Sequence, residues 1–319
     1  MPFLIGTDEA GYGPNLGPLT VTGTLWQCAN EGEDLYQSLS SIVTNVGKRE
    51  AATKLFVADS KKVYSSSGSI AALETSVLSL LRATNNQIPS NWQELIDMVC
   101  PSEVTKHLPS QVWLASQKLD LPVKADIDRI KLLSDQFLAE SEKAKTQLIK
   151  MQCVAVFPPE FNSQIEELGN KATLLSTKTL KIVRQLMDQT DDDLEIGCDK
   201  HGGRSKYAGL IQAFLTDEFI SIGEESADVS DYCFRENDRD VAIRFQAKGE
   251  SFLPTALASM VSKYVREIFM MLWNDFWQLR IPDIKPTKGY PQDAKRFKAE
   301  IEKFQIELGI DNHSIWRNR

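Results

Sequence analysis

The stretch that decides the fold is FLIGTDEAGYGP, residues 3–14. A short apolar run ends in two adjacent carboxylates, Asp8 and Glu9, and then breaks into a turn rich in glycine and proline. Apolar residues resume at 19–26, so the pattern predicts two strands joined by a turn. Two interpretations of the acids remain open at this point. They belong either to an ordinary turn, which favours Asp and Gly, or to a metal site that faces a phosphate.

The composition is that of an ordinary globular protein with one large domain or two smaller ones. The chain has 319 residues, 42% of them hydrophobic, and no apolar run reaches the length of a membrane span. The N-terminus has no signal-peptide pattern. Five scattered cysteines, none in a CxxC pair, argue for a reducing compartment and against a zinc site. We therefore expect a cytoplasmic protein that does not associate with membranes.

The net charge of -8 is unevenly distributed along the chain. Residues 217–240 hold nine acids and two arginines, a local net of -7, so the rest of the chain is close to neutral. Local patches matter more than the total for binding phosphates, and a nucleic-acid partner is therefore not excluded. We interpret the acidic stretch itself as a solvated loop or helix face.

Two further segments place basic residues after a strand-like run. Residues 55–63 lead into Asp-Ser-Lys-Lys, where Lys61 is either a solvated turn residue or a phosphate contact. Residues 194–199 form a short strand that ends in Asp199 and continues as KHGGR. Glycines there would bring backbone N–H groups close to a phosphate, with Lys200 and Arg204 beside them.

Periodicity in the remaining sequence predicts an alternation of helices and strands. Strands are expected at 153–157 and 241–247, and helices at 70–81, 126–150, 171–187, 207–215, 254–276 and 293–308. The helix at 171–187 carries Lys178, Lys181 and Arg184 on one side, a face that is either solvated or in contact with phosphate. The helix at 254–276 begins with small residues, which allow close packing against a neighbour.

Three strand-like segments end in acids, namely Asp8-Glu9, Asp199 and Glu250. Carboxylates from separate strand ends can converge at one edge of a sheet, where four of them cannot all stay ionised without a cation. Hard divalent cations with oxygen ligands resolve that repulsion. Two such ions about 4 Å apart would activate a water and stabilise the leaving oxygen of a phosphodiester. The three histidines are too far apart in sequence to suggest a competing zinc site.

These motifs resemble those of the type 2 ribonucleases H, ribonuclease HII and HIII. Residues 8–14, DEAGYGP, are similar to the family's opening DEAGRGP, and residues 59–63 are similar to its DSKKL segment. Weaker similarities follow in the family's order at 170–174, 194–199, 256–267 and 288–291. The resemblance therefore extends from residue 8 almost to the C-terminus.

The resemblance implies an α/β, ribonuclease H-like fold with a mixed central sheet flanked by helices and an inserted helical subdomain. We expect a single catalytic domain over 1–319. The family pattern does not cover 85–125, a helical insertion, or 217–240, an acidic insertion. Residues 280–319 are expected to form a basic, helical C-terminal segment.

The resemblance also implies roles for individual residues. The metal ligands and catalytic carboxylates would be Asp8, Glu9, Asp199 and Glu250, which together bind two Mg²⁺ or Mn²⁺ ions. Glutamate at the last of these positions is typical of ribonuclease HIII. The substrate contacts would be the backbone of Gly11-Tyr12-Gly13 to ribose 2′-hydroxyls, Lys61 to a phosphate, and Tyr290 stacked on a sugar. Tyr12 stands where the family has arginine, which puts the preference for an RNA–DNA junction in question.

The implied function is a metal-dependent endoribonuclease that cuts the RNA strand of RNA–DNA hybrids and leaves 5′-phosphate and 3′-hydroxyl ends. We expect a monomer whose insertions could bind a protein partner that the sequence does not identify. Two alternatives remain open: a catalytically weak or inactive hybrid-binding protein of the same fold, and a phosphoesterase that acts on a small substrate.

Overall fold

The computed structural model describes residues 1–64, 69–105, 107–115 and 117–318. Residues 106, 116 and 319, which belong to the segments expected at 85–125 and 280–319, lie outside the described part. The strands are β1 Phe3–Ala10, β2 Leu19–Gln27, β3 Val43–Thr44, β4 Leu55–Phe56, β5 Gln147–Val156, β6 Leu194–Asp199, β7 Ser221–Glu225, β8 Val229–Glu236 and β9 Arg239–Gln246. The longer helices are α4 Ala71–Asn85, α5 Trp92–Val99, α7 Ile127–Ala144, α8 Pro158–Leu168, α9 Lys171–Met187, α10 Ala208–Phe214, α11 Leu253–Gln278 and α12 Pro291–Glu307.

Short helical turns complete the assignment of the described residues. The four-residue helices are α1 Leu35–Ser38, α2 Gly47–Glu50, α3 Ser60–Val63 and α6 Ser102–Thr105. The 3₁₀ turns are η1 Leu108–Ser110, η2 Val112–Leu114, η3 Gly249–Ser251 and η4 Asn312–Ser314. No helix in the described ranges is both long enough and apolar enough to cross a membrane.

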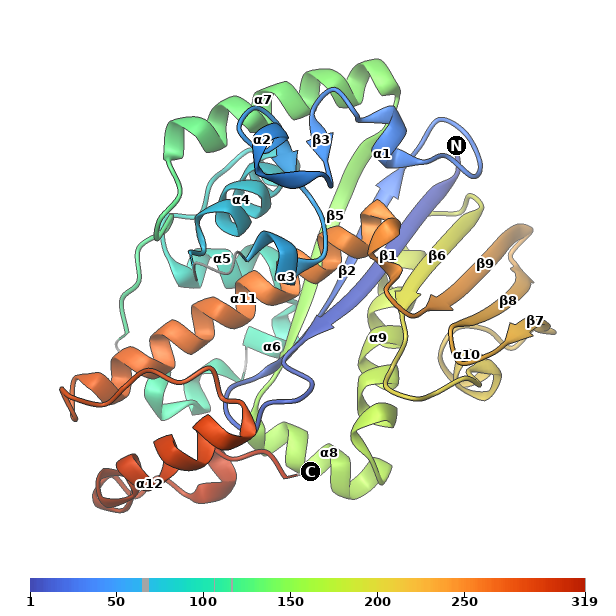
Figure 1. Ribbon diagram of the computed structural model, residues 1–319. Coiled ribbons are helices and arrows are strands. Elements are labelled where there is room, and N and C mark those ends of the chain that lie inside the picture. The colour runs from blue at the N-terminus through green and yellow to red at the C-terminus, as the bar shows by residue number, and fades with distance from the viewer. Residues whose placement is uncertain (65–68, 106, 116, 319) are drawn as a thin grey trace.

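A mixed sheet forms the centre of the molecule (Figure 1). Within the described residues it has seven strands in the order β5-β2-β1-β6-β9-β8-β7. The strands β1, β6 and β9 run parallel, while β2 pairs antiparallel with β1 and with β5. The sequence prediction of an opening hairpin and of a mixed sheet flanked by helices is therefore confirmed.

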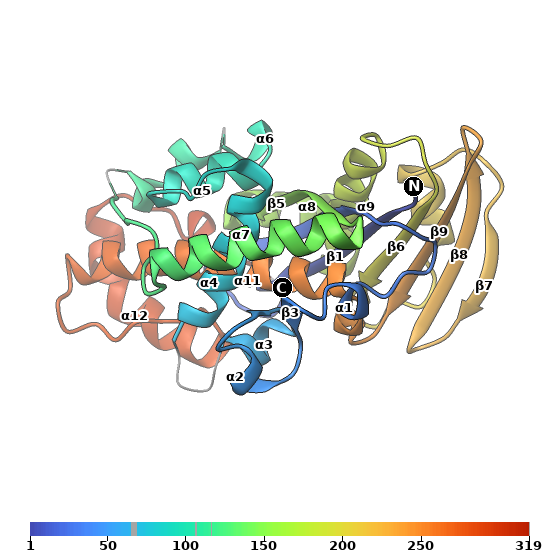
Figure 2. The same ribbon diagram turned by 90° about the horizontal axis from the view of Figure 1, so that it is seen from above.

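Helices lie on both faces of this sheet (Figure 2). The buried residues of the described chain form two hydrophobic cores. Side chains alternate across a strand, so neighbours on β1 enter different cores. Leu4 packs in the core that holds α11 and α4, whereas Phe3 and Ile5 pack in the core that holds α9. Because β1 is buried on both faces, the carboxylates at its end have fixed positions.

The long helix α11 lies directly against β1 and β2. A Cβ at Gly6 would come within 2.0 Å of the Pro254 carbonyl carbon, so only glycine permits this approach. Ser262 Oγ donates to the Asp8 carbonyl oxygen at 3.0 Å and is hydrogen-bonded to Thr22 Oγ1 at 2.7 Å. The close packing predicted from small residues at the start of this helix is therefore observed, and it anchors the end of β1.

The acidic stretch is not the solvated loop or helix face that its charge indicated. Residues 217–240 contain β7 and β8, which form the outer edge of the sheet (Figure 1). Ser230, Tyr232 and Phe234 are buried on one face of β8 and alternate with side chains that are more exposed. This period of two outweighs the high charge, because each inward residue packs against β9 or the adjacent core.

The helix predicted at 126–150 ends earlier than expected. Its last helical residue is Ala144, and Lys145 adopts a left-handed backbone with φ of 53° that closes the helix. The strand β5 then starts at Gln147, so it is longer than the strand predicted at 153–157. In the described part of 85–125 the chain forms short helices, among them α5 and α6.

Candidate metal site

Three of the predicted carboxylates meet at the ends of two parallel strands. The register pairs Thr7 with Cys198, which places Asp8 beside Asp199 where β1 and β6 end. Carboxylate oxygens of Asp8, Glu9 and Asp199 all lie within 4.8 Å of one another. The Asp8 side chain is buried, and it accepts a hydrogen bond from the backbone N–H of Glu9 at 2.7 Å.

The electrostatics of this cluster favour a bound cation. Burial, followed by the charges of Glu9 and Asp199, raises the pKa of the Asp8 carboxyl well above 3.8. Burial and Asp199 raise the pKa of Glu9 to about 8. Three close carboxylates stay ionised together only if positive charge compensates them. With oxygen donors alone in the group, the site suits Mg²⁺ or Mn²⁺ better than a zinc-type ion.

Glu250 lies at the border of this cluster. It belongs to η3, between β9 and α11, and is partly buried. Burial is the main cause that raises the pKa of Asp199, and the charge of Glu250 raises it further. Its carboxylate is nevertheless not among the three described groups whose oxygens approach within 4.8 Å. The structure therefore brings three of the four predicted ligands together and leaves the fourth adjacent to Asp199.

The glycine-rich turn lies beside the acids. Gly11 has a φ of 86°, a conformation that favours glycine. Burial and the charge of Glu9 raise the pKa of the Tyr12 hydroxyl, whereas Arg204 lowers it, so the phenol lies near both groups. The ammonium of Lys171 lies 4.5 Å from the centre of the Tyr12 ring. A Cβ at Gly13 would meet nothing within 4 Å, so this part of the turn is accessible.

Two other predicted contacts face outward near the cluster. Lys61 is exposed at the start of α3, and its positive charge lowers the pKa of Glu9. Tyr290 is 52% exposed and precedes α12. The turn that carries Tyr290 contacts the glycine-rich turn, because Asn15 N–H donates to the Gly289 carbonyl at 2.8 Å. Both side chains are therefore accessible to a ligand.

The side chain of Lys200 does not lie where a phosphate contact was expected. It is buried, and its ammonium donates to the Ser226 carbonyl at 2.6 Å and to Ser230 Oγ at 2.9 Å. Lys200 therefore links the β7–β8 hairpin to the end of β6. His201 is also buried, bonded to Ser176 Oγ at 2.9 Å, and burial lowers its pKa to about 3. Arg204 is only partly buried, and it donates to Thr173 Oγ1 at 3.0 Å.

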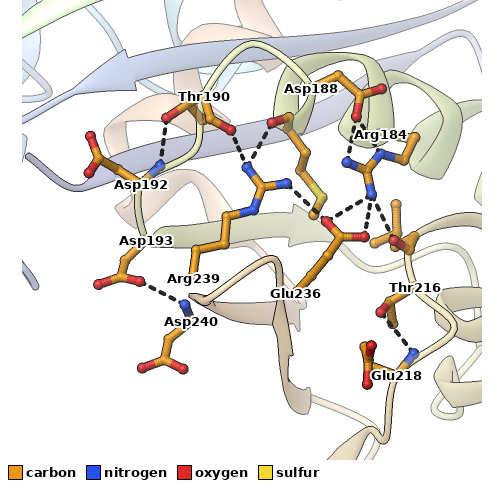
Figure 3. A network of polar contacts seen from close by, with 12 residues as sticks. Arg184, Asp188, Thr190, Asp192, Asp193, Thr216, Glu218, Glu236, Arg239 and Asp240 are labelled. Atoms are coloured by element: carbon orange, nitrogen blue, oxygen red, sulfur yellow. Dashed lines mark hydrogen bonds and ion pairs between the residues drawn. The ribbon is translucent and has the colours of Figure 1, made fainter.

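Two of the three basic residues on this face of α9, Arg184 and Lys178, are engaged in structural contacts, whereas Lys181 is exposed. Arg184 donates to Glu236 on β8 at 2.9 Å and 3.0 Å, and it also pairs with Asp188 (Figure 3). The buried Arg239 joins the same network and donates to Glu236 at 2.9 Å. Lys178 pairs with Glu160 at 2.6 Å. These pairs link α9 to the acidic edge of the sheet and to α8.

Sequence reasoning missed a pair of hydroxyls next to the acids. A hydrogen bond from Ser259 lowers the pKa of Asp8, opposing the effect of burial. Ser259 Oγ is also hydrogen-bonded to Ser60 Oγ at 3.1 Å. The two serines thus connect α11 and α3 to the end of β1. Both serines lie in segments that resemble the family motifs, 59–63 and 256–267, but we expected only small-residue packing and a lysine contact from these segments.

Comparisons with known proteins find structural likeness only. No protein-family model matches the chain, and no curated protein matches its sequence. The ribonuclease HII of a PCNA complex from Archaeoglobus fulgidus is 14% identical over 99% of this chain and 94% of that chain, with a TM-score of 0.42. The ribonuclease H2 from Pyrococcus horikoshii is 14% identical over 98% and 92%, with a TM-score of 0.44.

A third similar structure is Bst-RNase HIII in complex with Mn²⁺. It is 14% identical over 99% of this chain and 66% of that chain, with a TM-score of 0.36. These three solved structures align over nearly the whole of this chain, and they are ribonucleases of the HII and HIII type, the family whose motifs the sequence resembles. At these identities and TM-scores the likeness does not assign an activity.

Proposed function

We propose that this protein is a metal-dependent endoribonuclease that hydrolyses the RNA strand of RNA–DNA hybrids. The observation that carries the proposal is the group of three carboxylates within 4.8 Å, with raised pKa values, beside an accessible glycine turn. Carboxylates arranged in this way bind divalent cations, and a pair of such cations supports phosphodiester hydrolysis.

Each carboxylate has a distinct part in the proposal. Asp8, Glu9 and Asp199 would hold the ions, and Glu250 would join them by turning toward Asp199. When bound, the two ions would polarise the scissile phosphate and lower the pKa of a water. Ser259 would keep Asp8 oriented through its hydrogen bond. Cleavage on the 3′-oxygen side of the phosphate would leave 5′-phosphate and 3′-hydroxyl ends.

The residues around the cluster would bind the nucleic acid. Lys61 would contact a phosphate on one side of the acids, and Arg204 would contact another beside Tyr12. Backbone groups of the Gly11-Tyr12-Gly13 turn would meet ribose 2′-hydroxyls, which distinguish RNA from DNA. Tyr290, exposed and held against the same turn, would stack on a neighbouring sugar.

The test uses two labelled duplexes with Mg²⁺, with Mn²⁺ and with EDTA. One carries a continuous RNA strand opposite DNA, and the other is DNA with a single embedded ribonucleotide. We expect metal-dependent cleavage of the first. Cleavage of the first alone would indicate specificity like that of ribonuclease HIII and would implicate Tyr12, whereas cleavage of both would indicate specificity like that of HII. Binding of hybrid without any cleavage would refute the enzyme proposal. Hydrolysis of small phosphate esters alone would favour a phosphoesterase that acts on a small substrate.

The variant Asp8→Asn should abolish the cleavage. It removes one charge from the buried group while keeping the size of the side chain. The matched control is Asp135→Asn on α7, an aspartate whose side chain is 63% exposed and pairs with Arg82. The control should cleave like the wild type. Unchanged cleavage by Asp8→Asn would remove Asp8 from the site.

A further inference from the structure

A segment near the C-terminal end of the described chain is built into the glycine-rich turn. Arg317 is 1% exposed, and its Nη2 donates to the Gly11 carbonyl at 2.7 Å and also to the Pro14 carbonyl. Its backbone N–H donates to the Asn15 carbonyl at 2.8 Å, and Asn15 Nδ2 donates back to the Arg317 carbonyl at 3.1 Å. One residue therefore contacts the turn at three residues.

The helix α8 holds this segment in place from below. The Arg317 guanidinium lies 4.7 Å from the centre of the Phe161 ring. The buried Asn162 side chain donates to the Trp316 carbonyl at 2.8 Å and accepts from Asn318 N–H at 2.7 Å. The bonds of Asn162 to the neighbours of Arg317 therefore hold this segment in one position. The segment has little conformational freedom left to lose when a ligand binds.

A second buried guanidinium, that of Arg266, supports the same turn from α11. Arg266 on α11 donates to the Lys288 carbonyl at 3.0 Å and to the Leu16 carbonyl at 3.4 Å. A Cβ at Gly11 would lie 2.5 Å from Arg266 Nε, so the turn rests directly on this side chain. Because Lys288 is two residues before Tyr290, the turn at 11–16 and the segment that carries Tyr290 are connected through one side chain.

We propose that Arg317 is a positioning residue for recognition of the ribose. By holding the Gly11 and Pro14 carbonyls, it fixes the direction of the peptide groups between them, including the backbone N–H and C=O groups next to the acids. A turn ordered before binding pays no ordering entropy when it meets a 2′-hydroxyl, so preorganisation strengthens recognition of the sugar without touching the reacting atoms. This inference rests on the proposed function, since it assigns a task to the turn of that same site.

The experiment compares Arg317→Ala and Arg317→Lys with the wild type and with Arg280→Ala. Arg280 is the matched control, because it also donates to a backbone carbonyl, that of Phe276, and packs on a ring, but at the far end of α11. The readouts are KM and kcat on the continuous hybrid, the ratio of affinities for hybrid and for all-DNA duplex in Ca²⁺, and amide hydrogen exchange over residues 11–17.

For Arg317→Ala we expect KM to rise about tenfold, because a freed turn must be ordered on binding and fixing the backbone of one residue costs about a factor of ten, while kcat changes little. The preference for hybrid over DNA duplex should fall, and exchange over 11–17 should quicken. Arg317→Lys should be intermediate, because a single ammonium lacks the planar fork that reaches two carbonyls. If the alanine variant does not fold, KM, the preference for hybrid and the exchange of Arg317→Lys test the proposal instead.

Equal KM and equal preference for hybrid in the wild type and both variants would overturn the inference. So would a loss of kcat at constant KM, which would indicate a smaller active fraction rather than a displaced turn. If the wild type cleaves no hybrid, the proposed function fails on its own terms, and the exchange measurement still decides whether Arg317 fixes the turn. Unaltered exchange over 11–17 in both variants would then refute the proposal that Arg317 fixes the turn.

Discussion

Replacing Glu9 by glutamine should stabilise the metal-free protein at high pH. Burial and Asp199 raise the pKa of Glu9 from 4.5 to about 8 in the folded state. Between those values the folded protein holds a proton that the unfolded chain has released, so the stability of the metal-free protein falls as the pH rises through that window. Glutamine has the same shape and no charge to desolvate. The variant should therefore lack this part of the pH dependence.

The size of the effect follows from the same pKa. A rise from 4.5 to about 8 corresponds to about 5 kcal/mol, since each pH unit is worth about 1.4 kcal/mol. Water entry and side-chain relaxation around an ionised Glu9 reduce the penalty. Above about pH 8 we therefore expect metal-free Glu9→Gln to be about 2–4 kcal/mol more stable than the wild type, and near pH 5 the two should be nearly equal.

Divalent cations should narrow that difference. An ion that binds only the folded state at about 100 times its Kd adds about 2.7 kcal/mol, and wild-type protein should gain more than the variant, which has lost one ligand. The assay is urea unfolding at about pH 5 and pH 9, in EDTA and in Mn²⁺, for both proteins. A wild-type stability that rises between the two pH values in EDTA, or equal Mn²⁺ stabilisation of both proteins, would contradict the assignment of Glu9 to a cation site.

Two further outcomes test the surroundings of the site. Lys61→Ala should weaken binding of the hybrid severalfold and lower the slope of log K against log salt by about one, because one phosphate contact is lost; an unchanged slope in a fluorescence anisotropy titration would contradict that contact. Glu74→Gln should lower the free energy of unfolding, measured in urea, by about 3 kcal/mol. The buried Glu74 carboxylate accepts from the backbone N–H groups of 123–125 and from Tyr264 Oη–H, and the amide nitrogen of glutamine cannot accept. A loss below about 1 kcal/mol would mean that these bonds are replaced by water.

The part of the site that the sequence predicted is the part that local pattern controls. An apolar run that ends in an acid specifies both the strand and the position of the carboxylate at its end. Asp8-Glu9 and Asp199 satisfy this rule, and because β1 and β6 run parallel, their ends meet. Glu250 comes from a 3₁₀ turn, whose side-chain direction depends on how α11 packs, and it lies beside the cluster rather than inside it.

The predictions that failed depended on contacts between distant segments. Lys200 follows a strand end and precedes glycines, as a phosphate contact would, yet its ammonium is taken up by the β7–β8 hairpin. The sequence around Lys200 contains no sign of that hairpin. Residues 217–240, which contain the hairpin, were expected to form a solvated loop or helix face, because their high charge obscured the alternation of buried side chains on β8. One error therefore led to the other: once 217–240 is assigned to strands at the sheet edge, the strand end beside it is no longer open.

The distribution of charge restricts the path that a nucleic acid can take across the molecule. The edge formed by β7 and β8 carries the strongly negative stretch, and its few arginines are engaged in ion pairs, Arg239 with Glu236 among them. Phosphates would be repelled there. Away from that edge, Lys61 is exposed, and Tyr290 is exposed on a segment whose Lys288 carbonyl accepts from the buried Arg266. If the protein binds a hybrid as we propose, a duplex approaching from that side would meet its sugar and phosphate contacts before the carboxylates, and the acidic edge would direct it there by repulsion.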